Sequence, residues 1–146
     1  MIVPRPLLHA YWAMHNVLDR VSGGRLSTVR PSASRLGVLF VTTTGHRTGQ
    51  PRRNGLYFVE DGPTYVVVAS NAGAGVEPAW WRNLQAKPEG TVELGGRATQ
   101  VRARPATPDE KERLWPEFVR RDRTFSEYQR ATTRSIPVVI LEPRST

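Results

Sequence analysis

A basic turn carries the strongest chemical signal in the sequence. The stretch TTTGHRTGQPRRNGLYFVEDG, residues 42–62, places three arginines and one histidine between two apolar runs, with no acidic residue before Glu60. The arginines are Arg47, Arg52 and Arg53. Their guanidinium groups match the oxygens of a phosphate or carboxylate, and Gly45 and Gly49 let the backbone turn tightly beside such a ligand. Because a charge-assisted hydrogen bond contributes about 1.5 to 3 kcal/mol, this spacing predicts an anion site, with a solvated loop as the alternative.

The overall charge raises the question of nucleic acid. The chain has a formal net charge of +8 and a pI near 11.0, and it holds seven arginines and no carboxylate between Asp19 and Glu60. Such a charge is typical of proteins that neutralise phosphates, although genomic base composition can also enrich arginine. The cations gather before and within one turn, whereas a nucleic-acid reader spreads them along a groove. We therefore expect no nucleic-acid partner, and a basic nucleic-acid-binding module is the lesser alternative.

The sequence lacks the common motifs of enzymes that catalyse reactions without a cofactor or that bind nucleotides. There is no cysteine, no HExxH, no GxSxG and no Walker motif, and GAGVEP at 73–78 lacks the last glycine of the dinucleotide fingerprint. His9, His15 and His46 are too scattered to predict a metal site. A chain of this kind that performs chemistry borrows it from a bound cofactor. With no signal-peptide pattern and no apolar run of about 18 residues, we expect a cytoplasmic protein.

The N-terminal region has the pattern of an amphipathic helix. Residues 7–21, LLHAYWAMHNVLDRV, place apolar side chains on one stripe at helical spacing, and Gly23 and Gly24 follow as a C-cap would. The pattern leaves open whether this helix docks on the core or on a membrane surface, so peripheral membrane association is an alternative. The chain of 146 residues has the size of one folded unit, which we divide into a helix and linker at 1–35 and a cofactor-binding domain at 36–146.

The elements that position the basic turn read as short strands separated by turn signals. Apolar or alternating runs occur at 36–44, 54–60, 64–70, 90–96, 97–106 and 136–143. Two helices interrupt them, one between Pro78 and Pro88 and one that begins at Thr107, where Pro108 and Glu110 complete a capping box. About six strands with few helices predict an α+β fold that is mainly antiparallel, and a small barrel rather than a parallel sheet.

Four blocks of the sequence resemble one enzyme family. They are TTTGHRTGQPRRNGLYF, YVVVASNAGAGVEPAWWRNLQAKP, RLWPEF and YQRATTRSIPVVILEP. In this order they resemble the deazaflavin-dependent nitroreductase and quinone reductase family, whose members use reduced coenzyme F420. The resemblance runs from about Leu39 to Pro143. It implies a split β-barrel with flanking helices, related to the pyridoxamine-phosphate-oxidase-like flavoproteins, and a cofactor with a phosphate and a polyglutamate tail.

The same resemblance implies which residues bind the cofactor. Around the phosphate and along the pocket they are His46, Arg47, Thr48, Arg52, Arg53, Asn54, Gly55, Leu56 and Tyr57. Around the deazaflavin ring they are Val68, Ala69, Ser70, Asn71, Ala79, Trp80, Trp81, Arg82 and Asn83. Of the two tryptophans, we expect one to form a stacking platform and the other to belong to the core.

The implied activity is hydride transfer from the reduced deazaflavin to an electrophilic acceptor such as a quinone or a nitro compound. Ser70 and Tyr128 carry the best-placed hydroxyls for catalysis, and Phe125 and Tyr128 are the candidate substrate-binding residues. Phe125 and Asp122 stand where relatives often have tyrosine, which favours quinones over nitro compounds. An FMN- or haem-binding protein on the same barrel is the alternative, and the protein is expected to be a monomer or a homodimer.

Overall fold

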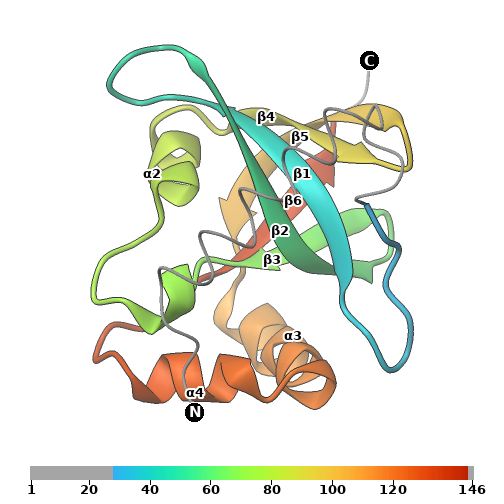
Figure 1. The fold of residues 1–146 in the computed structure, drawn as a ribbon, viewed down its shortest axis with the longest axis vertical. Coiled ribbons are helices and arrows are strands. Elements are labelled where there is room, and N and C mark those ends of the chain that lie inside the picture. Colours follow the sequence, from blue (N-terminus) through green and yellow to red (C-terminus); the bar gives the residue numbers. More distant parts are fainter. Residues whose placement is uncertain (1–27, 145–146) are drawn as a thin grey trace.

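The fold is a closed barrel of six antiparallel strands (Figure 1). A computed structural model of the chain describes residues 28–144, so the helix predicted at 7–21 lies outside the described residues. The strands are β1 Gly37–Thr44, β2 Pro51–Asp61, β3 Thr64–Val68, β4 Glu89–Leu94, β5 Arg97–Pro105 and β6 Val138–Pro143. They pair in the order β1-β2-β3-β6-β5-β4, and β4 pairs with β1 to close the barrel. The prediction of a small antiparallel barrel is confirmed.

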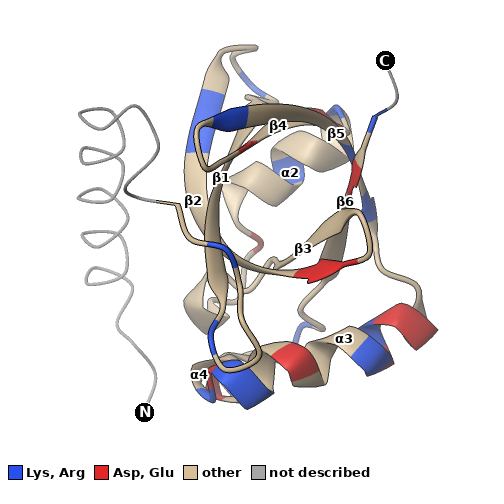
Figure 2. Ribbon diagram, turned by 90° about the vertical axis from the view of Figure 1, so that its right-hand side faces the viewer, with Lys and Arg blue, Asp and Glu red and all other residues tan. Residues whose placement is uncertain are grey.

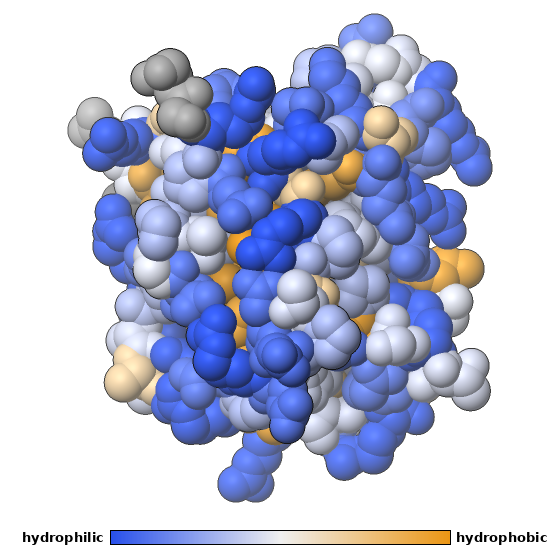
Figure 3. All heavy atoms as spheres, turned by 180° about the vertical axis from the view of Figure 1, so that it is seen from behind, coloured by the Kyte–Doolittle hydropathy of each residue, from blue (hydrophilic) through white to orange (hydrophobic). Residues whose placement is uncertain are grey.

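Alternating side chains fill the barrel interior. Val92 and Leu94 on β4 and Val101 and Ala103 on β5 are all buried, as the period of two predicts. They join residues of the other strands in one apolar cluster. The hairpin turns that connect the strands follow the sequence signals, because Gly62, Gly95 and Gly96 all adopt positive φ angles that favour glycine. The molecular face in Figure 3 is mostly hydrophilic, with apolar residues in small separate spots.

Helix α2, Ala79–Ala86, packs at the barrel and contacts β1 and β5. Pro78 precedes its first residue, which agrees with the start predicted from the sequence. Its side chains Trp80, Trp81 and Leu84 belong to the same apolar cluster as the barrel interior. Figure 1 shows the helix beside the barrel, next to the turn that joins β1 and β2, and Figure 2 shows it overlapping the barrel opening in projection. The helix is therefore fixed to the barrel by apolar burial, and its residue Asn83 contacts the basic turn.

Helices α3, Pro108–Arg121, and α4, Thr124–Arg130, lie together against the outside of the barrel (Figure 1). Thr107 and Glu110 form the predicted capping box of α3. Their buried residues form a second apolar cluster with residues of β2, β3 and β6. The sequence did not predict α4, which has seven residues and no side-chain hydrogen bond at its N-cap. Tertiary contacts with α3 and the 3-10 helix η1, Asn71–Gly73, hold it instead.

The described part of the N-terminal segment, residues 28–36, packs on the barrel. Val29 pairs with Val38 through two backbone hydrogen bonds of 2.9 and 2.8 Å. Arg121 Nε donates to the Ser32 carbonyl oxygen at 2.8 Å, and Arg120 donates to that of Ala33. These contacts tie the segment to β1 and to the end of α3. Within residues 28–144, no helix has the length and apolar character needed to cross a membrane.

Candidate functional site

The basic turn between β1 and β2 has a defined backbone structure. Gly45 N–H donates to the Gln50 carbonyl oxygen at 2.8 Å, and Gly49 N–H donates to the Gly45 carbonyl oxygen at 2.8 Å. Gly49 has a φ of 72°, a left-handed conformation that L side chains rarely adopt. The turn therefore keeps one shape while His46, Arg47 and their neighbours stay exposed.

Asn83 of α2 connects the helix to this turn. Its side chain is buried, and Oδ1 accepts from the His46 backbone N–H at 3.0 Å. The same oxygen lies 2.5 Å from His46 Nδ1, and Asn83 Nδ2 donates to Thr43 Oγ1 at 3.0 Å. Thr43 is buried as well. One amide thus joins α2, β1 and the turn, and its polar atoms are committed to the protein rather than to a ligand.

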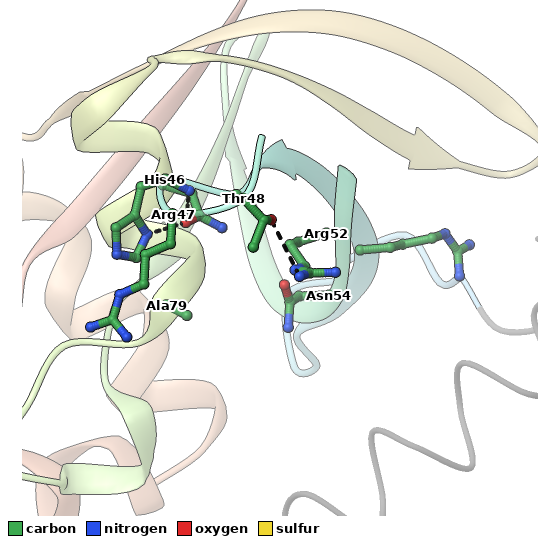
Figure 4. A pocket seen from close by; sticks show the side chains of 9 residues that line it. His46, Arg47, Thr48, Arg52, Asn54 and Ala79 are labelled. Atoms are coloured by element: carbon green, nitrogen blue, oxygen red, sulfur yellow. Dashed lines mark hydrogen bonds between the residues drawn. The ribbon is translucent and has the colours of Figure 1, made fainter. Parts of the chain in front are cut away.

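A pocket of about 310 Å³ opens between the turn, the start of β2 and the start of α2. It is lined by Gly45, His46, Arg47, Thr48, Arg52, Arg53, Asn54, Ala79 and Asn83. Figure 4 shows Arg47 and Arg52 on either side of Thr48, with Asn54 beside Arg52. Arg52 Nη2 donates to Thr48 Oγ1 at 3.4 Å. Among residues 28–144 no carboxylate lines the pocket, which therefore has a cationic wall that suits an anionic ligand.

The three arginines of the turn differ in their surroundings. Within residues 28–144, neither Arg47 nor Arg52 forms an ion pair with a carboxylate. Arg53 is partly buried, its Nε lies 2.7 Å from Glu93 Oε2, and its guanidinium lies 3.9 Å above the centre of the Phe40 ring. The alternation of the strand predicted that Arg53 would face away from Arg52, but both residues line the pocket, and they differ in their partners instead. The charge of Arg53 is therefore already balanced by a carboxylate of the protein.

Both tryptophans of α2 lie in the core. Trp80 and Trp81 are 5% and 4% exposed, and their ring centroids are 6.4 Å apart. The sequence predicted that one of them would form an open stacking platform, but neither has an exposed ring face of that kind. Trp81 Nε1 is buried and has no hydrogen-bond partner in the described part of the chain. The apolar contacts of a short helix with the barrel outweigh the exposure that a platform needs.

Several other residues predicted to bind the cofactor do not line this pocket. Gly55, Leu56 and Tyr57 follow Asn54 on β2, and Val68 and Ala69 are buried at the end of β3. Arg82 lies on α2, half-buried, and does not line the pocket.

The segment after β3 forms a second polar feature, held by an arginine that sequence reasoning did not single out. Arg134 Nε donates to the Ala74 carbonyl oxygen at 2.9 Å, and Nη2 donates to those of Ser70 at 2.9 Å and Ala69 at 3.2 Å. The segment needs this support because Asn71 and Ala72 have φ angles of 45° and 54°. The position of Ser70 thus depends on Arg134.

The two predicted substrate residues belong to α4 and are buried in the second apolar cluster. Phe125 and Tyr128 are 5% and 7% exposed, with ring centroids 5.5 Å apart in an edge-on arrangement. Phe125 also packs edge-on against Trp115 and Phe118. Burial raises the pKa of the Tyr128 phenol above its usual value. Ser70 is half-buried, and none of these three residues lines the basic pocket.

Comparisons with known proteins identify the family of the chain. A family model described as F420H(2)-dependent quinone reductase matches residues 14–143. An F420H(2)-dependent quinone reductase of Mycobacterium tuberculosis strain H37Rv is 35% identical over 135 residues, which cover 90% of this chain and 89% of that protein.

Solved structures extend the comparison to the fold. A structure titled as an F420-H2 dependent reductase is 35% identical with a TM-score of 0.66, and the match covers 72% of this chain and 93% of that one. A putative pyridoxamine 5'-phosphate oxidase from Listeria innocua, 18% identical with a TM-score of 0.55, covers 74% of this chain and 84% of that one and shares the fold alone. The split-barrel prediction is therefore confirmed. The chain belongs to the F420H(2)-dependent quinone reductase family, so it is a deazaflavin-dependent reductase whose cofactor is coenzyme F420.

Proposed function

We propose that the protein transfers a hydride from reduced coenzyme F420 to a quinone, and that the basic pocket binds the anionic part of the coenzyme. The observation that carries this proposal is the cationic lining without a carboxylate, in which Arg47 and Arg52 have no acidic partner among residues 28–144. Two guanidinium forks with unpaired charge suit a phosphate or a carboxylate tail. The residues present therefore fit an anionic cofactor.

The pocket residues contribute binding and orientation. Arg47 and Arg52 bind the anionic groups, and the fixed turn places both side chains in the lining of the pocket. Ala79 presents a small side chain at the start of α2, which leaves room for a ligand to approach the helix. When bound, the reduced coenzyme supplies the hydride. The protein then lowers the barrier by holding donor and acceptor close together in a favourable orientation.

The acceptor also needs a proton. Conversion of a quinone to a hydroquinone takes one hydride and one proton, and the proton comes from water or from a hydroxyl of the protein. Ser70 and Tyr128 are the hydroxyls that we propose for orienting the acceptor. Because burial raises the pKa of Tyr128, its phenol is a weaker acid than a free phenol and donates a hydrogen bond more readily than a full proton. Arg134 fixes the backbone at Ser70 and thereby the direction of its side chain.

A steady-state assay tests the reaction. Purified protein with reduced F420 and a menadione-type quinone should reduce the quinone, and a bicyclic nitroimidazole should react slowly or not at all. Ser70→Ala should lower kcat/KM for the quinone by about fivefold, because a positioned hydroxyl contributes about 1 kcal/mol, while the dissociation constant of F420 stays unchanged. Tyr128→Phe is the matched variant on α4. Absence of quinone reduction at any coenzyme concentration would refute the proposed function, and full activity in both variants would leave water as the proton source.

A further inference from the structure

The hydrogen bonds of Asn83 determine its own orientation. The backbone N–H of His46 can only donate, so the Asn83 atom 3.0 Å away must be the oxygen. The amide nitrogen then faces Thr43, where Nδ2 donates to Oγ1 at 3.0 Å. Because Asn83 is 3% exposed, water does not compete for these bonds. The buried amide therefore has one orientation that satisfies all of its neighbours.

That orientation also determines the tautomer of His46. The Asn83 oxygen carries no hydrogen, and it lies 2.5 Å from His46 Nδ1, so Nδ1 must carry one. The remaining ring nitrogen, Nε2, is left for a ligand, since His46 is exposed and lines the pocket. In the neutral ring Nε2 is an acceptor and repels an anionic oxygen. In the protonated ring it becomes a cationic N–H donor.

We propose that Asn83 is a positioning residue that couples anion binding in the pocket to protonation of His46 at Nε2. This inference rests on the proposed function, because the anion is taken to be that of coenzyme F420. A bound anion favours the protonated ring, and by linkage a protonated ring binds the anion more tightly. Binding therefore takes up a proton, and affinity falls as the pH rises.

The charged groups around His46 strengthen this coupling. The turn and β2 contribute Arg47 and Arg52, which oppose a further positive charge while the pocket holds no anion. Arg53 lines the same pocket, but its charge is balanced by Glu93. On the helix side, α2 presents Ala79 and Asn83 to the pocket and carries Arg82 next to Asn83 in sequence, and the described part of the chain adds no carboxylate to the lining. A bound anion removes the repulsion from these arginines, so proton uptake and anion binding favour each other.

The tautomer can be measured without any ligand. Long-range ¹H–¹⁵N correlation spectra distinguish the two neutral tautomers, and the His46 signal is assigned by its loss in His46→Gln. In the wild type we expect the Nδ1–H tautomer at a pH where the ring is neutral. Asn83→Ala should move the population towards Nε2–H, whereas Asn83→Asp, whose carboxylate accepts the same two bonds, should keep Nδ1–H. An Nε2–H tautomer in the wild type, or no change in Asn83→Ala, would overturn the inference.

The coupling is measured by titration with oxidised F420 between about pH 5.5 and 8.5. The wild-type dissociation constant should rise by up to tenfold per pH unit. His46→Gln is the control, because any pH dependence of its dissociation constant comes from protonation of the coenzyme itself. In Asn83→Ala the dissociation constant should depend on pH much less than in the wild type. In Asn83→Asp the pH dependence should return and lie at higher pH, because a carboxylate stabilises the protonated ring. Equal pH profiles for the wild type and His46→Gln would overturn the coupling while the proposed function stands. A wild type that does not bind F420 at any pH would overturn both.

Discussion

The basic pocket and the apolar cluster under α3 and α4 are built in opposite ways. The pocket is made of exposed side chains on a turn, held by two backbone hydrogen bonds and one buried amide. The cluster is made of aromatic and aliphatic side chains that are almost fully buried, such as Phe118 at 0% and Phe125 at 5% exposure. Changes in the pocket should therefore alter binding and leave the fold intact, whereas changes in the cluster should alter stability first.

The segment from Ser70 to Ala74 lies between these two cases. Its backbone is polar and partly strained, yet it packs closely on α4, where a side chain added at Gly73 would come within 2.9 Å of the Tyr128 carbonyl oxygen. Arg134 holds it through three carbonyl oxygens. A proposed catalytic residue, Ser70, thus depends on the packed region for its position, while the cofactor site does not.

The largest effect is expected in the cluster. Phe125→Ala should lower the free energy of unfolding by about 3 to 5 kcal/mol, because it removes a buried ring that contacts Trp115, Phe118 and Tyr128. Urea unfolding measures this change. Phe125→Leu keeps most of the volume and allows kinetics on folded protein, with F420 affinity expected within twofold of wild type. If Phe125→Leu kept full stability but lost quinone turnover, Phe125 would be a substrate contact rather than a packing residue.

Substitutions in the pocket should change stability less than Phe125→Ala does and should change F420 binding more. Arg47→Ala and Arg52→Ala should each weaken F420 binding by about 1 to 3 kcal/mol, roughly 5- to 150-fold in the dissociation constant, because each removes a charge-assisted contact. Unfolding free energies should stay within about 0.5 kcal/mol of wild type. Arg130→Ala is the matched control, since it removes the same charge from an exposed position on α4. Equal affinities for all three variants would contradict the assignment of the pocket.

The smallest effect is expected at the start of α3. The hydrogen bond from Arg104 holds the pKa of Glu110 at about 2, below the ordinary value of 4.5. Because the folded value is the lower one, the stabilisation is present above about pH 4.5 and is lost as the pH falls through about 2.

The two side chains of this pair are 38% and 22% exposed, so solvent screening limits the effect to about 1 kcal/mol or less. Urea unfolding should show that the wild type is more stable than Glu110→Gln by this amount at neutral pH. The difference in unfolding free energy should disappear near pH 2. If the difference in unfolding free energy persisted near pH 2, ionisation of Glu110 would not be the source of the stabilisation.

The barrel and the pocket lining could be predicted because their signals are local. Alternation marks Val92, Leu94 and Val101, glycines mark the hairpin turns, and Thr107 with Glu110 marks the start of α3. The charge and spacing of the basic turn predicted an anion site, and residues of the turn line one pocket.

The rest depends on contacts between distant parts of the chain. Helix α4 is too short to be predicted from propensity and is held by its neighbours. The hydrogen bonds of Arg134 span 60 to 65 residues, and those between Asn83 and His46 span 37, so neither role is visible in a local window. The burial of both tryptophans of α2 likewise follows from where the helix meets the barrel.

The central claim is that the basic pocket selects a cofactor with a long anionic tail. Fluorescence titration with oxidised F420 and with FMN, each at low and high salt, tests it most directly. We predict that F420 binds more tightly than FMN and that its affinity falls more steeply as salt rises, because its tail offers more charges to Arg47, Arg52 and their neighbours. Equal or tighter binding of FMN, or an F420 affinity that does not depend on salt, would contradict the account.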